Sequence, residues 1–273
     1  MRNPKSFRIS SIEFFTFNAD STTGSPLIPV QQLEINIGAV NQYAFKEVDD
    51  TIAWIGSTAQ SKIGIYVLNG LNPKKVSNPY IESQLATSTT AGIFVTAGKI
   101  VGKTFLVVTS SVGTFVYVVE DDMWHEWSGQ VRYWHKFAAN TAATPVVYSI
   151  TRDDTSGKVF KLNPVSPVFT DNGNTYTMTI QTSKFDMDKE RRKFLHKLAI
   201  IGDTSESSST FNVSWSDDDY VTFSSARTID ISSNRTYLTN CGSFRRRAFK
   251  LTNSSAYPVR LEALELEVSE GLH

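Results

Sequence analysis

The chain consists almost throughout of short runs of β-branched and aromatic residues, and each run ends at a turn-forming residue. The run 51–55 ends at Gly56, and the run 64–68 ends at the dipeptide 69–70, which is Asn-Gly. Gly and Asn tolerate positive φ at low cost, so such connections are typical of tight β-hairpins. Because helical periodicity is nearly absent, the sequence predicts an all-β fold.

One short helix is expected at 79–85, where Pro79 can take the first helical position. A strand that carries an aromatic residue followed by aliphatic ones recurs at Tyr66, Tyr117 and Phe160. Repeats of about 40–50 residues fit β-propeller blades, although a β-sandwich with hairpins of similar length gives the same trace. The pattern favours propeller-like blades for residues 1–165, possibly as an incomplete propeller.

The character of the sequence changes at 163–167, where two prolines interrupt the strand pattern. Afterwards the alternation is cleaner, with apolar residues at every second position of 211–215, which places one face inward. In the last strand the apolar phase changes between Ala263 and Leu264, which predicts a β-bulge. We therefore expect a second domain, an antiparallel β-sandwich, over residues 166–273.

Composition excludes several classes of protein. The 27 basic and 27 acidic residues give zero net charge, which argues against bulk attraction to nucleic acid or membranes. The single cysteine, Cys241, excludes an intrachain disulfide and Cys-rich zinc sites. Apolar stretches are far shorter than the ~20 residues that span a bilayer, and the first residues lead into no secretory signal. No catalytic motif is present, so we expect no catalytic residues, no metal, no cofactor and no membrane insertion.

The histidines do not have metal-ligand spacing. His125 and His135 are ten positions apart among Trp127, Tyr133 and Trp134, so aromatic core packing is the preferred interpretation. His196 lies in an alternating segment and is expected on the solvent face of a strand.

The densest carboxylate cluster is 217–219, three consecutive aspartates. Paired carboxylates can act as acid and base on a glycoside, or bind calcium. The surrounding pattern, however, resembles the structural Asp-box turn of sialidase-like propellers, with Tyr220 where that motif usually has Gly. We therefore expect an Asp-box-like turn whose side chains bond to the turn backbone. Its residues are Ser216, Asp218, Thr222 and Phe223.

Two basic clusters remain as candidate contacts to a DNA channel or to a neighbouring subunit, or as intrachain ion pairs. If 245–247 is a strand, its first and third arginines point one way and the second the other. Arginine forks suit both phosphates and the acidic rims of interfaces. The clusters are Lys189, Arg191, Arg192 and Lys193, and Arg245, Arg246 and Arg247.

Taken in order, several segments resemble the packaged-DNA stabilisation proteins of short-tailed phages, which form the tail hub or nozzle below the portal and its adaptor. The likeness covers about residues 10 to 268. The resemblance implies one of two possibilities. The chain is either about the C-terminal half of a longer family member, without the N-terminal part, or a compact relative of the family. The segments are 48–56, 64–70, 73–77, 114–117, 124–127, 157–162, 215–218 and 242–249.

The resemblance implies a non-enzymatic virion protein, assembled in the host cytoplasm into a homo-oligomeric ring of about six subunits in the phage tail. Such a ring would continue the DNA channel, retain packaged DNA, and dock the portal adaptor, the tail needle or plug, and a fibre or spike. Double-stranded DNA would pass through it, and a neutral chain suits passage because each neutralised phosphate strengthens binding.

Two other functions stay open at this point. One is a carbohydrate-binding or glycan-hydrolysing, sialidase-like propeller, motivated by the Asp-box-like turn and by Trp54, Trp124, Trp127 and Trp134. The other is a free-standing protein-interaction propeller in a bacterial cytoplasm.

Overall fold

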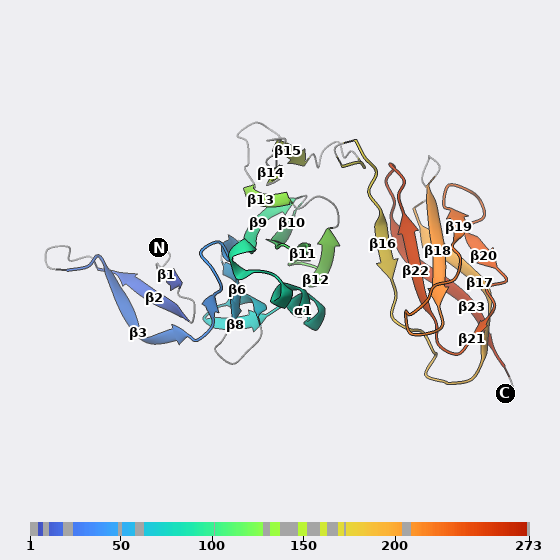
Figure 1. Cartoon of the computed structure of the whole chain (residues 1–273), viewed down its shortest axis with the longest axis horizontal. Helices are drawn as coiled ribbons and strands as arrows, with labels where there is room; N and C mark the ends of the chain where they lie inside the picture. Colours follow the sequence, from blue (N-terminus) through green and yellow to red (C-terminus); the bar gives the residue numbers. More distant parts are fainter. Residues whose placement is uncertain are drawn as a thin grey trace. The chain divides into compact units, whose positions relative to one another are not determined.

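A computed structural model of the chain resolves it into two compact units, residues 1–166 and 167–273 (Figure 1). Independent folding of the two expected domains, 1–165 and 166–273, stays a prediction. Among the described residues, no helix is long and apolar enough to cross a membrane. The structure describes residues 5–7, 11–18, 24–48, 51–57, 63–100, 102–127, 132–136, 147–151, 159–162, 169–171, 173–203 and 209–271.

The first unit is built of antiparallel sheets whose strands mostly follow one another along the chain. The first sheet has β1 (Lys5–Phe7), β2 (Ile12–Phe17) and β3 (Leu27–Ile35). The second has β4 (Gly38–Ala39), β5 (Phe45–Val48), β6 (Thr51–Ser57), β7 (Gly64–Asn69) and β8 (Asn72–Lys75). The third has β9 (Phe94–Ile100), β10 (Lys103–Thr109), β11 (Thr114–Val118) and β12 (Met123–Trp127). The fourth has β13 (Arg132–Lys136), β14 (Val147–Thr151) and β15 (Val159–Leu162).

The internal repeat seen in the sequence corresponds to equivalent strands of successive sheets. Tyr66 lies on β7, Tyr117 on β11 and Phe160 on β15, and in each sheet that strand pairs antiparallel with the strand just before it in the chain. The strand β9 also contacts both β5 and β13, as the first strands of neighbouring propeller blades do. The expected all-β fold with propeller-like blades is therefore confirmed.

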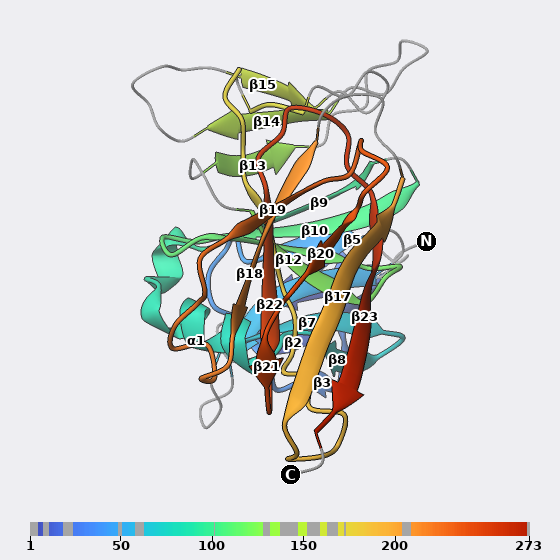
Figure 2. The ribbon, with the colours of Figure 1, turned by 90° about the vertical axis from the view of Figure 1, so that its right-hand side faces the viewer.

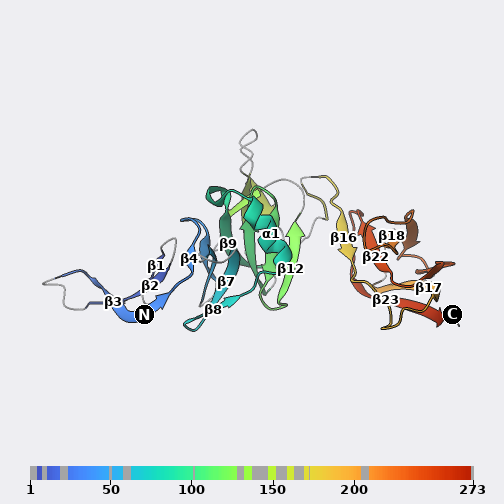
Figure 3. The ribbon, with the colours of Figure 1, turned by 60° about the horizontal axis from the view of Figure 1, so that its bottom comes forward.

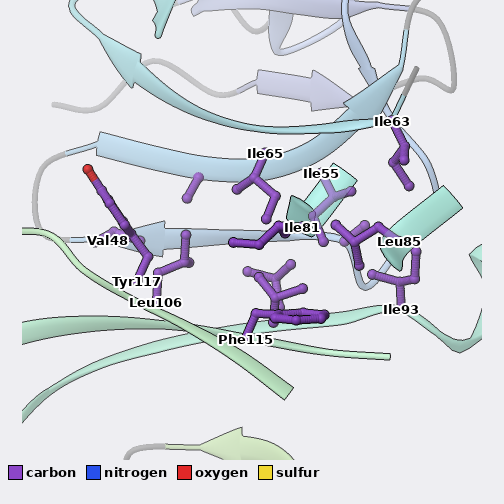
Figure 4. Close-up of a cluster of buried hydrophobic side chains, with 14 residues drawn as sticks. Val48, Ile55, Ile63, Ile65, Ile81, Leu85, Ile93, Leu106, Phe115 and Tyr117 are labelled. Carbon is purple, nitrogen blue, oxygen red and sulfur yellow. The ribbon is translucent and has the colours of Figure 1, made fainter. Parts of the chain in front are cut away.

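A helix and the second and third sheets share one apolar core. The helix α1 (Pro79–Thr87) begins with Asn78 as its N-cap and Pro79 in its first turn, as expected from the sequence. Figure 4 shows Ile81 and Leu85 in one cluster with Ile65 and Phe115, which come from β7 and β11. A 3₁₀ turn, η1 (Thr90–Gly92), follows the helix. The core between these two sheets thus includes a helical layer.

The second sheet is covered on its other face as well. Trp54 and Tyr66 stack there with ring centroids 5.6 Å apart, and they pack against Ile12, Phe14 and Ile35 of β2 and β3. Successive side chains of a strand point to opposite faces, so β6 and β7 supply apolar residues to both cores. A sheet buried on both faces is what an inner blade of a propeller requires.

The second unit is a sandwich of two antiparallel sheets, which Figure 3 shows as two layers. Its core combines Leu198 and Ile200 of one sheet with Phe211, Val213 and Leu251 of the other. The expected β-sandwich is therefore confirmed, including the inward face at 211–215. One sheet has β16 (Met178–Gln181), β22 (Ala248–Asn253), β18 (Thr210–Ser216) and β19 (Arg227–Asp230); the other has β20 (Tyr237–Thr239), β21 (Ser243–Phe244), β17 (Lys193–Gly202) and β23 (Leu261–Glu270).

The predicted bulge lies where β23 pairs with β17. Ala263 is opposite Ile201, but Leu261 is opposite Gly202, so Glu262 is the extra residue. The bulge is confirmed, whereas the expectation that Ala263 shares a face with Leu261 was wrong, because the bulge precedes it and leaves it exposed.

Candidate interaction site in the second unit

The turn after β18 is built around the carboxylate of Asp218. Its Oδ1 accepts from the backbone N–H of Thr222 at 2.9 Å and from the hydroxyl of Ser216 at 2.8 Å, and its Oδ2 accepts from the hydroxyl of Thr222. Donors to the charged form favour it, so the side-chain hydroxyl and the backbone N–H of Thr222, and then the hydroxyl of Ser216, lower the pKa of Asp218 to about 2. Asp218 therefore organises the turn.

Tyr220 replaces the usual glycine of the motif at a real conformational cost. Asp219 and Tyr220 both have positive φ, 61° and 71°, the left-handed region that glycine enters most cheaply. The backbone N–H of Tyr220 donates to Ser216 Oγ at 2.9 Å, and its hydroxyl donates to the carbonyl of Thr182 at 3.1 Å. These two bonds hold the residue in place. Phe223, the last residue of the turn pattern, is half-buried beneath the ammonium of Lys250.

Arg247 is only 2% exposed and joins this turn to the neighbouring strands. Its Nε and Nη2 each lie 2.7 Å from a carboxylate oxygen of Asp217, and Nη1 donates to the carbonyl of Cys241. The guanidinium also stacks over the rings of Phe244 and Trp215, at 4.6 and 5.0 Å. Planar stacking combined with a bidentate fork is specific to arginine.

Residues 245–247 do not form a strand, so the alternation considered for the three arginines does not apply. Arg245 and Arg246 form the bend between β21 and β22, and only Arg247 enters the ladder, through a bridge to Phe185. The reason is local, since the bend turns Arg247 inward to Asp217 while the other two arginines stay exposed.

Each of the three consecutive aspartates already has a hydrogen-bond or ion-pair partner within the unit. Asp217 pairs with Arg247, and Asp218 serves its own turn. Asp219 lies 2.8 Å from the ammonium of Lys184 and 3.4 Å from the guanidinium of Arg246. Across the described part of the chain, no three His, Cys, Asp or Glu side chains are grouped so that they could hold a metal. Two of the three aspartates thus pair with cations, Asp217 with Arg247, and Asp219 with Lys184 and Arg246.

Lys193 brings the two basic clusters together from the inside. It is fully buried, and its ammonium donates to the carbonyls of Lys189, Arg191 and Arg245, the last two at 3.0 Å. Lys193 and Arg247 were expected among possible contacts to DNA or to another subunit. That expectation needs correction, because both cations are enclosed by partners of their own unit.

The other five basic residues of the two clusters lie at the surface. Lys189 pairs with Glu270 at 2.6 Å. Arg191, Arg192 and Arg245 are exposed, and none of them forms an ion pair with any residue that the structure describes. Together with Arg246 they remain candidate contacts to a partner.

Two of the four histidines, His125 and His196, are exposed, and the side chains of the other two lie outside the described residues. His125 lies exposed on β12, so the expectation that it packs in an aromatic core was wrong. Trp124, its neighbour on β12, packs against the apolar core and donates its indole N–H to the carbonyl of Val76 at 2.8 Å, while Trp127 packs on the opposite face of the sheet. His196 is exposed, as expected, with Nε2 2.7 Å from Ser269 Oγ. The side chain of His135 lies outside the described residues.

A depression of about 490 Å³ in the first unit is bordered by the β7–β8 and β11–β12 hairpins. Tyr117 donates its hydroxyl to Asp122 there, and burial raises the pKa of Tyr117. Lys74 lies 4.0 Å from the same carboxylate. Trp54, a candidate sugar-stacking residue, is fully buried elsewhere in the unit and does not line this depression. Tyr117, the aromatic residue that does line it, is only 3% exposed.

A comparison with known protein families finds one family that matches the first unit. The family described as bacteriophage P22 Gp10, beta-propeller, matches residues 6–164, which is more than half of the chain. The chain belongs to this family. The match to the Gp10 family spans the four sheets of the first unit, so the chain is a phage β-propeller protein of a structural family. The second unit, which carries the candidate interaction site, lies beyond the matched residues.

Solved structures add little to this Gp10-family assignment. The chain matches an exo-beta-1,3-galactanase from Phanerochaete chrysosporium at 9% identity and a TM-score of 0.21, over 94% of this chain and 63% of that one. It matches a glycoside hydrolase at 10% identity and a TM-score of 0.24, over 96% and 66%. The chain spans about two thirds of the length of both proteins. No curated protein matches the sequence significantly.

Proposed function

We propose that the protein is a tail hub or nozzle subunit of a short-tailed phage. In this role, copies of the chain form a ring of about six that continues the DNA channel below the portal and its adaptor. The ring retains packaged DNA and docks the tail needle and the fibres or spikes. It resides in the virion tail after assembly in the host cytoplasm.

The observation that carries the proposal is the Gp10-family match over the same residues that form the stacked sheets. Consecutive sheets share closed apolar cores, and the second sheet is buried on both faces. Close-packed cores have low compressibility, which suits a part that must hold its shape against packaged DNA.

Charge supports passage of DNA rather than tight binding. The chain has as many basic as acidic residues, and the aspartates of the second unit neutralise several of its cations. Binding to DNA strengthens with each phosphate that a protein neutralises, so few free cations favour a channel that does not slow ejection.

Imaging of the purified protein with and without a portal–adaptor complex tests the proposal. We expect rings with a central hole that add to the distal end of the adaptor, and DNA binding that disappears at moderate salt. A matched incubation with portal alone, lacking the adaptor, should give no attachment. A monomer that ignores the adaptor, or measurable turnover of a glycan, would overturn the proposal.

A further inference from the structure

The first sheet forms one end of the stack of sheets in the first unit. Its inner face packs against the second sheet through Ile12, Phe14 and Ile35. The other end of the stack, β13–β15, lies beside β9 (Figure 2). In Figures 1 and 3 the β2–β3 hairpin extends away from the other strands of the unit. The outward face of this hairpin therefore points away from the stack.

Four apolar side chains form a continuous patch on that outward face. Phe15 is opposite Pro29 in the ladder and Phe17 is opposite Leu27, and side chains at paired positions share a face. Phe17 is 71% exposed, Pro29 is exposed, and the other two are half-buried. None of the four belongs to an apolar cluster of the described residues. Contiguous exposed apolar residues mark an interaction surface, and we call these four residues the arm face.

The hairpin favours a contact made by side chains with another protein. β3 is the outermost strand of its sheet, and Pro29 within it has no backbone N–H to offer to a further strand. Residues 9–45 include three acidic residues and no Lys or Arg, which disfavours attraction to an anionic membrane. The arm face therefore suits an apolar protein surface better than strand addition or a charged membrane.

The depression between the β7–β8 and β11–β12 hairpins offers such a surface. Val67, Val76 and Val119 line it with partly exposed side chains. The charged residues that line it, Lys74 and Asp122, lie 4.0 Å from each other, so their charges are already paired. Its volume of about 490 Å³ lies within the range of about 300–1,000 Å³ that is typical of pockets. An aromatic side chain therefore fits there.

We propose that the arm face of one copy of the chain docks in this depression of the next copy. The arm face belongs to the first sheet, whereas the depression lies between hairpins of the second and third sheets, so the contact is head-to-tail. Head-to-tail contacts generate rings when the rotation closes, and every copy then uses one arm face and one depression. The inference rests on the proposed ring and names the surfaces that join neighbouring subunits.

A single contact of this kind is weak. An aromatic side chain such as Phe17 buries roughly 150–250 Å². Stable interfaces bury about 800 Å² per partner, so one docked arm does not hold two copies together at low concentration. In a closed ring each copy makes two such contacts, and assembly therefore depends steeply on concentration.

Sedimentation of the full chain over a concentration series tests the contact. We expect Phe17→Ser with Leu27→Ser to weaken association at least tenfold, because the arm face loses most of its apolar surface. Val119→Arg should do the same, because its long charged side chain occupies the apolar depression. The matched controls are Ile28→Ser, on the opposite face of the hairpin, and Val112→Arg, exposed outside the depression; both should associate like the wild type.

Disulfide trapping tests the two surfaces directly. Copies with Phe17→Cys, mixed with affinity-tagged copies with Val119→Cys, should form a covalent one-to-one dimer on mild oxidation. The native Cys241 is buried and does not compete. Ile28→Cys in place of Phe17→Cys is the control and should give at least fivefold less dimer, because its side chain lies on the other face.

The outcomes separate the two proposals. A wild-type protein that forms rings, with variants that assemble equally well or with no trapped dimer, overturns the docked arm and leaves the proposed ring intact. A wild-type protein that stays monomeric at every concentration overturns the self-association on which both depend. Binding to phosphatidylcholine vesicles that is lost in Phe17→Ser with Leu27→Ser would assign the arm face to a membrane and also overturn the contact. Near-ultraviolet circular dichroism checks that each variant is folded.

Discussion

Arg247 and Lys193 show how a cation can stabilise the inside of a small β-sandwich. Arg247 meets a carboxylate, a backbone carbonyl and two aromatic rings, whereas Lys193 meets backbone carbonyls alone. Burying a charge is costly unless every donor finds a partner, and both side chains satisfy that condition. From sequence, contacts to DNA, contacts to a subunit and intrachain ion pairs all stayed open for both residues, because neither the bend at 245–246 nor the loop that encloses Lys193 has a sequence signature.

Replacement of the buried Arg247 should destabilise the second unit. We expect Arg247→Ala to lower the free energy of unfolding of the second unit by about 2–3 kcal/mol, because Asp217 and the carbonyl of Cys241 lose their partner. Urea unfolding followed by tryptophan fluorescence measures this. The matched control is Arg246→Ala, whose side chain is 54% exposed, with an expected change within about 0.5 kcal/mol. Equal effects of the two substitutions would contradict the assignment.

Asp218 makes the turn sensitive to acid. Its folded pKa of about 2 lies below the ordinary value of 3.8, so its contribution to stability is present above pH 4 and is lost as the pH falls towards 2. We expect the stability difference between wild type and Asp218→Asn to shrink over that window.

The carboxyl resonance of Asp218, followed by NMR, gives the pKa directly. Thr222→Val removes the hydroxyl donor while keeping the backbone N–H. The pKa given by the titration curve of Asp218 should therefore rise towards 3.8. A measured pKa of 3.8 for Asp218 in the wild-type protein would show that the hydrogen bonds to Asp218 do not form.

At the scale of elements, local signals were read correctly and contacts between distant segments were not. The helix at Pro79, the equivalent strands at Tyr66 and Tyr117, and the bulge near Ala263 all follow from short patterns in the sequence. The placement of Arg247 against Asp217 depends on how three loops meet, and the exposure of His125 depends on which strand is outermost. Neither relation is encoded in neighbouring residues, so a single sequence does not predict it.

Gly202 lies very close to the backbone of Arg260, a residue far away in the sequence. A Cβ at this position would contact the carbonyl oxygen of Arg260, a backbone atom that has no easy way to move. We expect Gly202→Ala to destabilise the second unit by about 2 kcal/mol, because the bulge must open to admit a methyl group. The control is Gly24→Ala, where a Cβ would meet nothing within 4 Å. Thermal unfolding of both variants measures the difference, and an unchanged melting temperature for Gly202→Ala would contradict the close approach.

At the scale of the whole molecule, the two units keep separate apolar cores. The clusters of the first unit and that of the second share no residue. We therefore expect Leu251→Ala to weaken protection from hydrogen exchange only in residues 167–273, and Ile65→Ala only in residues 1–166. Each substitution should cost about 3 kcal/mol, because both side chains are fully buried. Loss of protection in both units from either substitution would contradict separate cores.

The pairing of β17 with β23 has a consequence for synthesis on the ribosome. Each sheet of the first unit is complete once a short stretch of chain has emerged, because its strands are neighbours in sequence. In the second unit, Lys193 is opposite Glu270, so β17 waits for some seventy further residues before its last neighbour exists. The blades are therefore free to fold during translation, while the sandwich closes only after β23 has been made. A chain that stops short of β23 would carry finished blades and an unfinished sandwich.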